Sequence, residues 1–206
     1  MAIFSAGLGH AGPIRSFEFA VVVQSVPALG VGYPMPGSLF RGRFAYDLAA
    51  APFPNDPRAY INPVTVFEID GLVTSLTSGS TISINNNDGI PPFDQFTLGA
   101  QVTGPDAGNA SLLNVLLRLR DEGASPDAFD GTALPDTLQL DWFNSAFLEI
   151  GYGRDGTQGG FVRARFTELG PARELPGPGV LPLALLALTV MWALRRLSDP
   201  LLSSQA

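Results

Sequence analysis

The stretch LFRGRFAYD, residues 39–47, alternates apolar and charged side chains. If it is extended, its aromatic residues share one face: Phe40, Phe44 and Tyr46. Its charged residues share the opposite face: Arg41, Arg43 and Asp47. A period of two residues is typical of a β-strand with one face in the core and the other in solvent. The sequence therefore predicts a strand that is buried through aromatic rings.

The same alternation recurs along residues 13–170, where no helix is clearly predicted. Residues 112–120 can be read as a short helix, but their leucine and valine spacing favours a strand. Asp70-Gly71 predicts a tight turn between two strands. The expected strands are 16–23, 39–47, two within 64–76, 80–84, 93–102, 112–120, 137–143, 146–152 and 160–169. Two packed antiparallel sheets bury such faces well, so we predict an all-β fold, an antiparallel, jelly-roll-like β-sandwich.

Composition narrows the classes of function. The net charge of −7 argues against binding to nucleic acid or to anionic lipid, both of which require clustered cations. The chain has no cysteine, which excludes disulfides and thiolate chemistry. Its single histidine, His10, lies in the first dozen residues. If that leader is removed, neither Ser-His-Asp catalysis nor a histidine-bound zinc remains.

The C-terminal sequence differs from the rest. The 15 residues Val180–Leu194 carry no charge, and Thr189 is their only polar residue. As a helix they would span about 22 Å, against about 30 Å for a bilayer core. Arg195 and Arg196 follow directly and should stay cytoplasmic as a membrane stop. We therefore predict a C-terminal transmembrane helix with the β-domain outside the cytoplasm. A buried core helix is the alternative.

This order of motif, apolar helix and arginine cluster resembles the PEP-CTERM sorting signal. The family's Pro-Glu-Pro matches Pro176, Gly177 and Pro178, with glycine in place of glutamate. The resemblance implies processing by an exosortase-type enzyme, a bacterial cell-envelope or extracellular-matrix setting, and exopolysaccharide as a partner. Residues 40–47 and the pair Leu134-Pro135 are also similar to strand patterns of such proteins. The stretch 175–179 is similar to a sortase signal as well, but it has proline where that signal needs threonine.

These features predict five segments. The N-terminal one is either a remnant of a signal peptide or a disordered terminus. Gly9-His10-Ala11 has the small-x-small pattern of a cleavage site, and we hypothesise that the sequence begins inside its signal peptide. The segments are 1–12, the β-sandwich ectodomain 13–170, a Pro/Gly linker with the sorting motif 171–179, the transmembrane helix 180–196 and a cytoplasmic tail 197–206.

A polar turn between two expected strands is a candidate calcium site. Its oxygen-bearing side chains are Asn85, Asn87, Asp88 and Asp94. Calcium prefers such hard oxygen ligands. The same residue types also favour turns, because their side chains bind nearby backbone groups. Both interpretations stay open, with calcium as the only candidate cofactor.

Two carboxylate pairs are conceivable for glycoside hydrolysis: Glu68 with Asp70, and Asp141 with Glu149. Surface solubility explains these residues equally well. The stretch GYGRDG, residues 151–156, matches a dinucleotide-binding pattern, but a strand follows it instead of a helix, so we expect a hairpin loop.

Four aromatic residues could form a platform for sugar stacking: Tyr33, Tyr60, Trp142 and Tyr152. Trp142 is in phase with Leu138 and Leu140, which favours core packing. We therefore expect an exported structural or adhesive protein with no catalytic residues. The alternatives are a secreted or anchored carbohydrate-active enzyme, a calcium-dependent carbohydrate-binding module, and an anchored protein that is not processed.

Overall fold

The computed structural model describes residues 12–26, 34–123, 126–154 and 157–172. Within these ranges ten strands and one short 3₁₀-helix form. The strands are β1 (Ile14–Ser25), β2 (Leu39–Asp47), β3 (Pro52–Phe53), β4 (Asp56–Ile61), β5 (Val64–Ile69), β6 (Ser75–Asp88), β7 (Phe93–Thr103), β8 (Ser111–Glu122), β9 (Ser145–Arg154) and β10 (Thr157–Pro171). The 3₁₀-helix η1 spans Leu140–Trp142.

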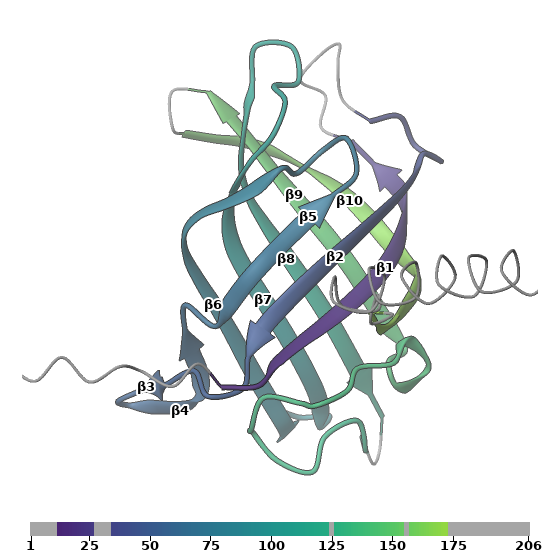
Figure 1. The fold of residues 1–206 in the computed structure, drawn as a ribbon. Helices are drawn as coiled ribbons and strands as arrows, with labels where there is room; N and C mark the ends of the chain where they lie inside the picture. Colours follow the sequence, from purple (N-terminus) through teal and green to yellow (C-terminus); the bar gives the residue numbers. More distant parts are fainter. Residues whose placement is uncertain (1–11, 27–33, 124–125, 155–156, 173–206) are drawn as a thin grey trace, which may run out of the picture. The chain divides into compact units, whose positions relative to one another are not determined.

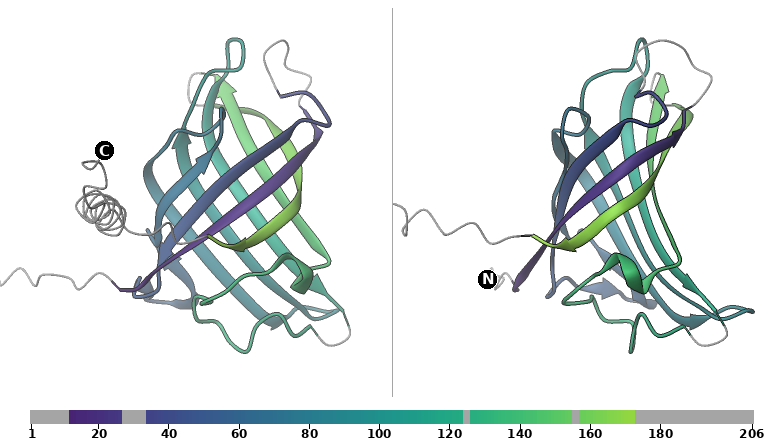
Figure 2. Two further views of the ribbon diagram at one scale, coloured as in Figure 1. Left: turned by 45° about the vertical axis from the view of Figure 1, so that its right-hand side comes forward. Right: turned by 90° about the vertical axis from the view of Figure 1, so that its right-hand side faces the viewer.

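All ten strands belong to one antiparallel sheet, in the order β3-β4-β6-β7-β8-β9-β10-β1-β2-β5. The sheet curls strongly, so that its two halves face each other across the core (Figures 1 and 2). The prediction of an all-β antiparallel fold is confirmed. The halves face each other as in a sandwich, but one continuous sheet replaces the two separate sheets that we expected. Strands β6 to β10 pair in chain order, and β10 pairs directly with β1, so no break separates the halves.

Aromatic rings fill the concave face of the sheet. Phe17 of β1 stacks on Phe44 of β2 with ring centroids 5.2 Å apart, and Phe44 lies 6.4 Å from Phe67 of β5. Phe96 of β7 approaches Phe44 from the opposite half of the sheet, at 6.3 Å. All four rings are buried. The alternation in residues 39–47 therefore places aromatic residues as predicted, and their contacts join the two halves.

The curl is held by hydrogen bonds that Ser80 of β6 makes with Asn62, the residue after β4, and with Val64, the first residue of β5. The Asn62 backbone N–H donates to the Ser80 carbonyl at 2.7 Å. In return, the Ser80 N–H donates to the Asn62 side-chain oxygen at 3.1 Å, and the Val64 N–H donates to the Ser80 hydroxyl at 3.2 Å. Asn62 has a φ of 50°, a left-handed conformation that asparagine tolerates better than most residues. One serine thus links a sheet edge to the opposite half.

The segment between β8 and β9 crosses one end of the curled sheet (Figure 1). Two tyrosines of the sheet hold it: the Tyr46 hydroxyl donates to the Pro135 carbonyl at 2.6 Å, and the Tyr60 hydroxyl donates to the Thr132 carbonyl at 2.9 Å. Burial raises the pKa of Tyr46 far above its ordinary value. The segment contributes four apolar side chains to the core: Phe129, Leu134, Leu138 and Phe143.

Several local predictions are confirmed and others are wrong. Residues 112–120 lie within strand β8, and Asp70-Gly71 forms a turn with Gly71 at a φ of 72°. Beyond that turn only Ile69 and Val73 pair, and β6 pairs with β4 and β7 instead. The strand expected at 137–143 is wrong, because that segment closes the sheet end and includes η1. Strands β3 and β4 were not predicted.

The predicted leader and tail lie outside the described residues, and so do Tyr33 and His10. The same holds for the sorting-motif and membrane-stop residues Pro176, Gly177, Pro178, Arg195 and Arg196. Among the residues that are described, no helix is long and apolar enough to cross a membrane.

Gly42 provides a test of this core. It lies on β2 between Phe19 of β1 and Ile69 of β5, and a Cβ there would overlap the Phe19 ring and the Glu68 carbonyl oxygen. We expect Gly42→Ala to lower the free energy of unfolding by about 1–3 kcal/mol, as overpacking does. Urea denaturation measures this. Gly170→Ala is the control, because nothing lies within 4 Å of its added Cβ. Equal stability of the two variants would contradict the packing described.

Candidate functional site

The candidate calcium residues do not converge. Asn85 pairs with Gln95 on the convex face of the β6–β7 hairpin, whereas Asp94 belongs to the concave face with Phe96. Asp94 is fully buried, with 0% of its surface exposed. Because side chains of adjacent strand residues point to opposite faces, Asn85 and Asp94 lie on opposite sides of the sheet.

The Asp94 carboxylate binds backbone groups. It accepts a hydrogen bond from the Asn87 N–H at 2.7 Å and another from the Phe129 N–H at 2.8 Å. The first bond holds the end of β6, and the second holds the segment that closes the sheet. Hydrogen bonds to an ionised acceptor are stronger than neutral ones. Asp94 therefore binds the end of β6 and also Phe129, which lies 35 residues further along the chain than Asp94 itself.

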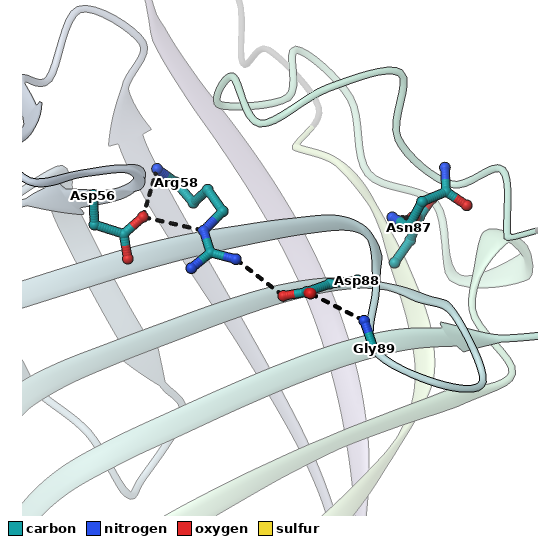
Figure 3. Close-up of polar contacts among 6 residues, drawn as sticks. Asp56, Arg58, Asn87, Asp88 and Gly89 are labelled. Carbon is teal, nitrogen blue, oxygen red and sulfur yellow. Dashed lines mark hydrogen bonds and ion pairs between the residues drawn. The ribbon is translucent and has the colours of Figure 1, made fainter.

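Asp88 points toward a different neighbour. Its carboxylate lies 3.0 Å from the Arg58 guanidinium and accepts the Gly89 N–H, also at 3.0 Å (Figure 3). Arg58 also binds Asp56 at 3.1 Å, and hydrogen bonds from Arg58 hold the pKa of Asp56 below its ordinary value. The Asn87 side chain lies away from this ion-pair network (Figure 3).

These contacts favour the turn over the metal site. Asn87 has a φ of 51° and Gly89 a φ of 81°, the left-handed conformations that asparagine and glycine adopt in turns. Both carboxylates are already bound by protein donors. Within the described ranges, no group of three or more His, Cys, Asp or Glu residues is placed to hold a metal ion.

The carboxylate pairs are also separated. Glu68 lies 2.8 Å from Arg43, and the hydrogen bond from Arg43 lowers the pKa of Glu68. An acid with a lowered pKa is ionised at neutral pH and is a poor proton donor. Asp70 is exposed in the turn after β5. Glu149 lies on the convex face of β9, 3.8 Å from Arg163, and Asp141 is exposed on η1.

The proposed aromatic platform does not form among the described residues. Tyr60 and Tyr152 are buried, with 8% and 1% of their surfaces exposed. Trp142 is half-buried and packs against the core, as its spacing predicted. Residues 151–154 and 157 onward form the paired strands of a β9–β10 hairpin, as expected for GYGRDG.

Sequence reasoning missed a group of residues on the convex face. Arg118 of β8, Phe147 of β9 and Arg165 of β10 stand side by side in one row across the three strands. The guanidinium of Arg163 lies 4.1 Å from the Phe147 ring centroid, and that of Arg118 lies 5.3 Å from it. We call Arg118, Phe147, Arg163 and Arg165 the arginine patch. The alternation had placed Arg163 and Arg165 outward, but only the strand register brings Arg118 and Phe147 beside them.

A shallow groove of about 360 Å³ lies on the same face. It is lined by Thr81 and Gly99, by the amides Gln101 and Asn114, and by Leu116 and Phe161. Phe161 is 44% exposed, although it is a large apolar residue. Gly99 has no side chain to fill the groove. Phe161 precedes Arg163 by two residues on the same face of β10, so the groove adjoins the arginine patch.

Comparison with known proteins gives no relative. No protein-family model matches the chain, and neither a curated protein nor a solved structure is significantly similar to it.

Asp94→Asn should destabilise the fold. One amide oxygen can replace one acceptor, but the amide nitrogen would face a backbone donor, so we expect a loss of about 2 kcal/mol in the free energy of unfolding. Chemical denaturation measures it. Asp88→Asn is the control, because its ion pair is exposed and should contribute less than about 1 kcal/mol. A larger effect at Asp88 than at Asp94 would refute the anchoring role.

Calcium should leave the melting temperature unchanged. A ligand that binds only the folded state raises stability by mass action, but the two carboxylates of the hairpin are engaged by the protein. Differential scanning fluorimetry with millimolar calcium, and with magnesium as the control, tests this. A rise specific to calcium, abolished by Asp94→Asn, would restore the metal site.

Proposed function

We propose that this chain is an exported, non-catalytic protein of a bacterial cell envelope or extracellular matrix, with a PEP-CTERM-like C-terminal sorting signal. A transmembrane helix over residues 180–196 holds it until an exosortase-type enzyme acts at Pro176–Pro178. The β-domain then serves a structural or adhesive role and binds polysaccharide. Where the motif is not cleaved, the same helix serves as a permanent anchor.

One observation carries the proposal: the order in which a proline motif, an apolar run and an arginine pair follow the folded sheet. Strand β10 ends at Pro171. The Pro-Gly-Pro motif at residues 176–178, the uncharged run 180–194 and the pair Arg195-Arg196 follow within a few residues of one another. The apolar run favours a lipid environment, and the arginines that follow it favour the cytoplasm.

The folded domain is consistent with a non-catalytic role. Apolar side chains fill the concave face, and the long segment between β8 and β9 covers one end of it. Among the described residues, the candidate acids Glu68 and Glu149 each face an arginine instead of a second carboxylate. The apolar concave face and these ion pairs support a binding role over a catalytic one.

Subcellular location and the mature C-terminus test this proposal. The full chain, expressed in a bacterium that carries an exosortase, should appear in the envelope or the medium. Intact mass spectrometry should show the loss of residues beyond about Pro178. In an exosortase-deficient strain, the uncleaved chain should stay in the membrane fraction.

Two variants sharpen that experiment. Pro176→Ala with Pro178→Ala should block cleavage but keep the chain in the membrane. Arg195→Gln with Arg196→Gln should weaken its retention, because the membrane stop is lost. A full-length chain recovered as a dissolved cytosolic monomer would refute export, anchoring and sorting together.

A further inference from the structure

The arginines of the patch differ from the other arginines of the domain. Five other arginines with described side chains each have a carboxylate oxygen within 3.1 Å: Arg15, Arg41, Arg43, Arg58 and Arg120. Arg118 and Arg165 form no ion pair with any described residue, and Arg163 reaches Glu149 only at 3.8 Å. The patch therefore carries more positive charge than the described carboxylates around it neutralise.

The charge of the patch contrasts with that of the chain. Three arginines and the neighbouring Glu149 give a local net charge of +2, while the whole chain carries −7, so the remainder carries −9. Such a local excess of one sign attracts a ligand of the opposite sign. An anionic ligand that meets the domain would find a favourable contact here.

The patch is also held in place before any ligand arrives. The guanidinium groups of Arg118 and Arg163 both lie over the Phe147 ring, 5.3 and 4.1 Å from its centroid, and this cation–π contact limits the movement of both side chains. The Arg118 Nε is shielded from solvent without a hydrogen-bond partner, so this side chain is partly desolvated. A planar guanidinium that is fixed in this way suits a planar carboxylate, which it binds through two parallel hydrogen bonds.

The spacing of the patch favours a ligand with repeated anionic groups. Neighbouring strands are about 4.8 Å apart, so Arg118 and Arg165, one strand either side of Phe147, are separated by roughly 10 Å. Arg163 and Arg165 are two residues apart on one strand, or roughly 7 Å. Carboxylates on successive units of a polymer can contact arginines that are spaced in this way.

The adjoining groove indicates what else the ligand carries. Its exposed Phe161 ring offers an apolar surface, and the side chains of Gln101 and Asn114 supply amide donors and acceptors. An aromatic face with convergent amides suits a sugar ring, which has apolar C–H faces and hydroxyl edges. A polyanion without sugar rings would bind the arginines and leave the groove empty.

We propose that the convex face of β7–β10 binds an acidic polysaccharide of the uronate type. Its carboxylates contact the arginine patch, and a neighbouring sugar ring lies over Phe161 in the groove. The choice of a polysaccharide over other polyanions rests on the proposed location outside the cytoplasm. Nucleic acid fits less well, because its affinity comes from many phosphate contacts, whereas the patch offers three arginines and the chain carries a net charge of −7.

The test measures binding of polygalacturonate to the full chain in a nonionic detergent, by affinity electrophoresis and calorimetry. Neutral dextran should not bind. Arg163→Gln with Arg165→Gln should weaken binding by about tenfold or more, because charge-assisted hydrogen bonds to the ligand carboxylates are lost. Phe161→Ala should weaken binding without any change of charge, so it tests the groove separately.

The matched control is Arg41→Gln with Arg43→Gln. These arginines also lie on the sheet's outer surface, and the substitution changes the net charge equally, but both are already paired with glutamates. Binding should change less than about twofold, because only screened long-range attraction is lost. Melting temperatures identify any variant that fails to fold, and Phe161→Ala then remains to decide.

Three results would overturn the proposal: no binding of polygalacturonate, equal losses in the patch and control variants, or tighter binding of single-stranded DNA than of polygalacturonate. The measurement uses purified protein and does not depend on export. Its failure would therefore leave the proposed sorting untouched, and a cytosolic location would leave a positive binding result intact.

Discussion

The fold depends on one constraint: a single curled sheet has to fill its concave face with its own side chains and those of the segment between β8 and β9. No helix lines that face among the described residues, so rings from opposite halves have to meet. Phe44 does this, since it contacts Phe17 and Phe67 in its own half and Phe96 in the other. Because Gly42 has no side chain, the Phe19 ring can occupy the space beside it. A close-packed interior of this kind contributes to stability, and the proposed binding surface lies on the convex face instead.

The buried polar groups serve the same constraint. Closing one end of the sheet brings backbone groups of the covering segment out of water, and an unpaired buried group is costly. Tyr46, Tyr60 and Asp94 supply the partners for Pro135, Thr132 and Phe129. These residues are chemically versatile, and in an open cleft each could act on a substrate. Here their hydrogen bonds are committed to the fold, so their presence is not a sign of catalysis.

Periodicity in the sequence predicts which face of a strand is buried but not which strands are neighbours. The alternation of residues 39–47 correctly placed Phe44 and Tyr46 inside. The segment 137–143 has the same alternation, but it lies across the end of the sheet, where no strand partner is available. Local pattern cannot distinguish these cases, because pairing is decided by hydrogen bonds between residues that are far apart in sequence.

The candidate sites show the same limit. Asp94 and Asp88 have the residue types of a calcium ligand set, and only their partners, Phe129 at 35 positions away and Arg58 at 30, reveal structural roles. The arginine patch was missed for the complementary reason. Arg118 and Arg165 are far apart in the sequence, and the β8–β9–β10 register alone brings them together around Phe147.

The arginine patch is positive and the chain as a whole is negative, and this contrast determines how salt would affect the proposed binding of a polyanion to the convex face. A polyanion approaching from a distance meets a molecule of net charge −7 and is repelled. At physiological ionic strength the screening length is about 8 Å, so acids farther away contribute little once the ligand is in contact. The arginines then act at hydrogen-bond range, where Phe147 already holds two of them. A moderate amount of added salt thus weakens the long-range repulsion more than it weakens the close contacts. On a surface that is basic throughout, added salt would instead weaken a long-range attraction.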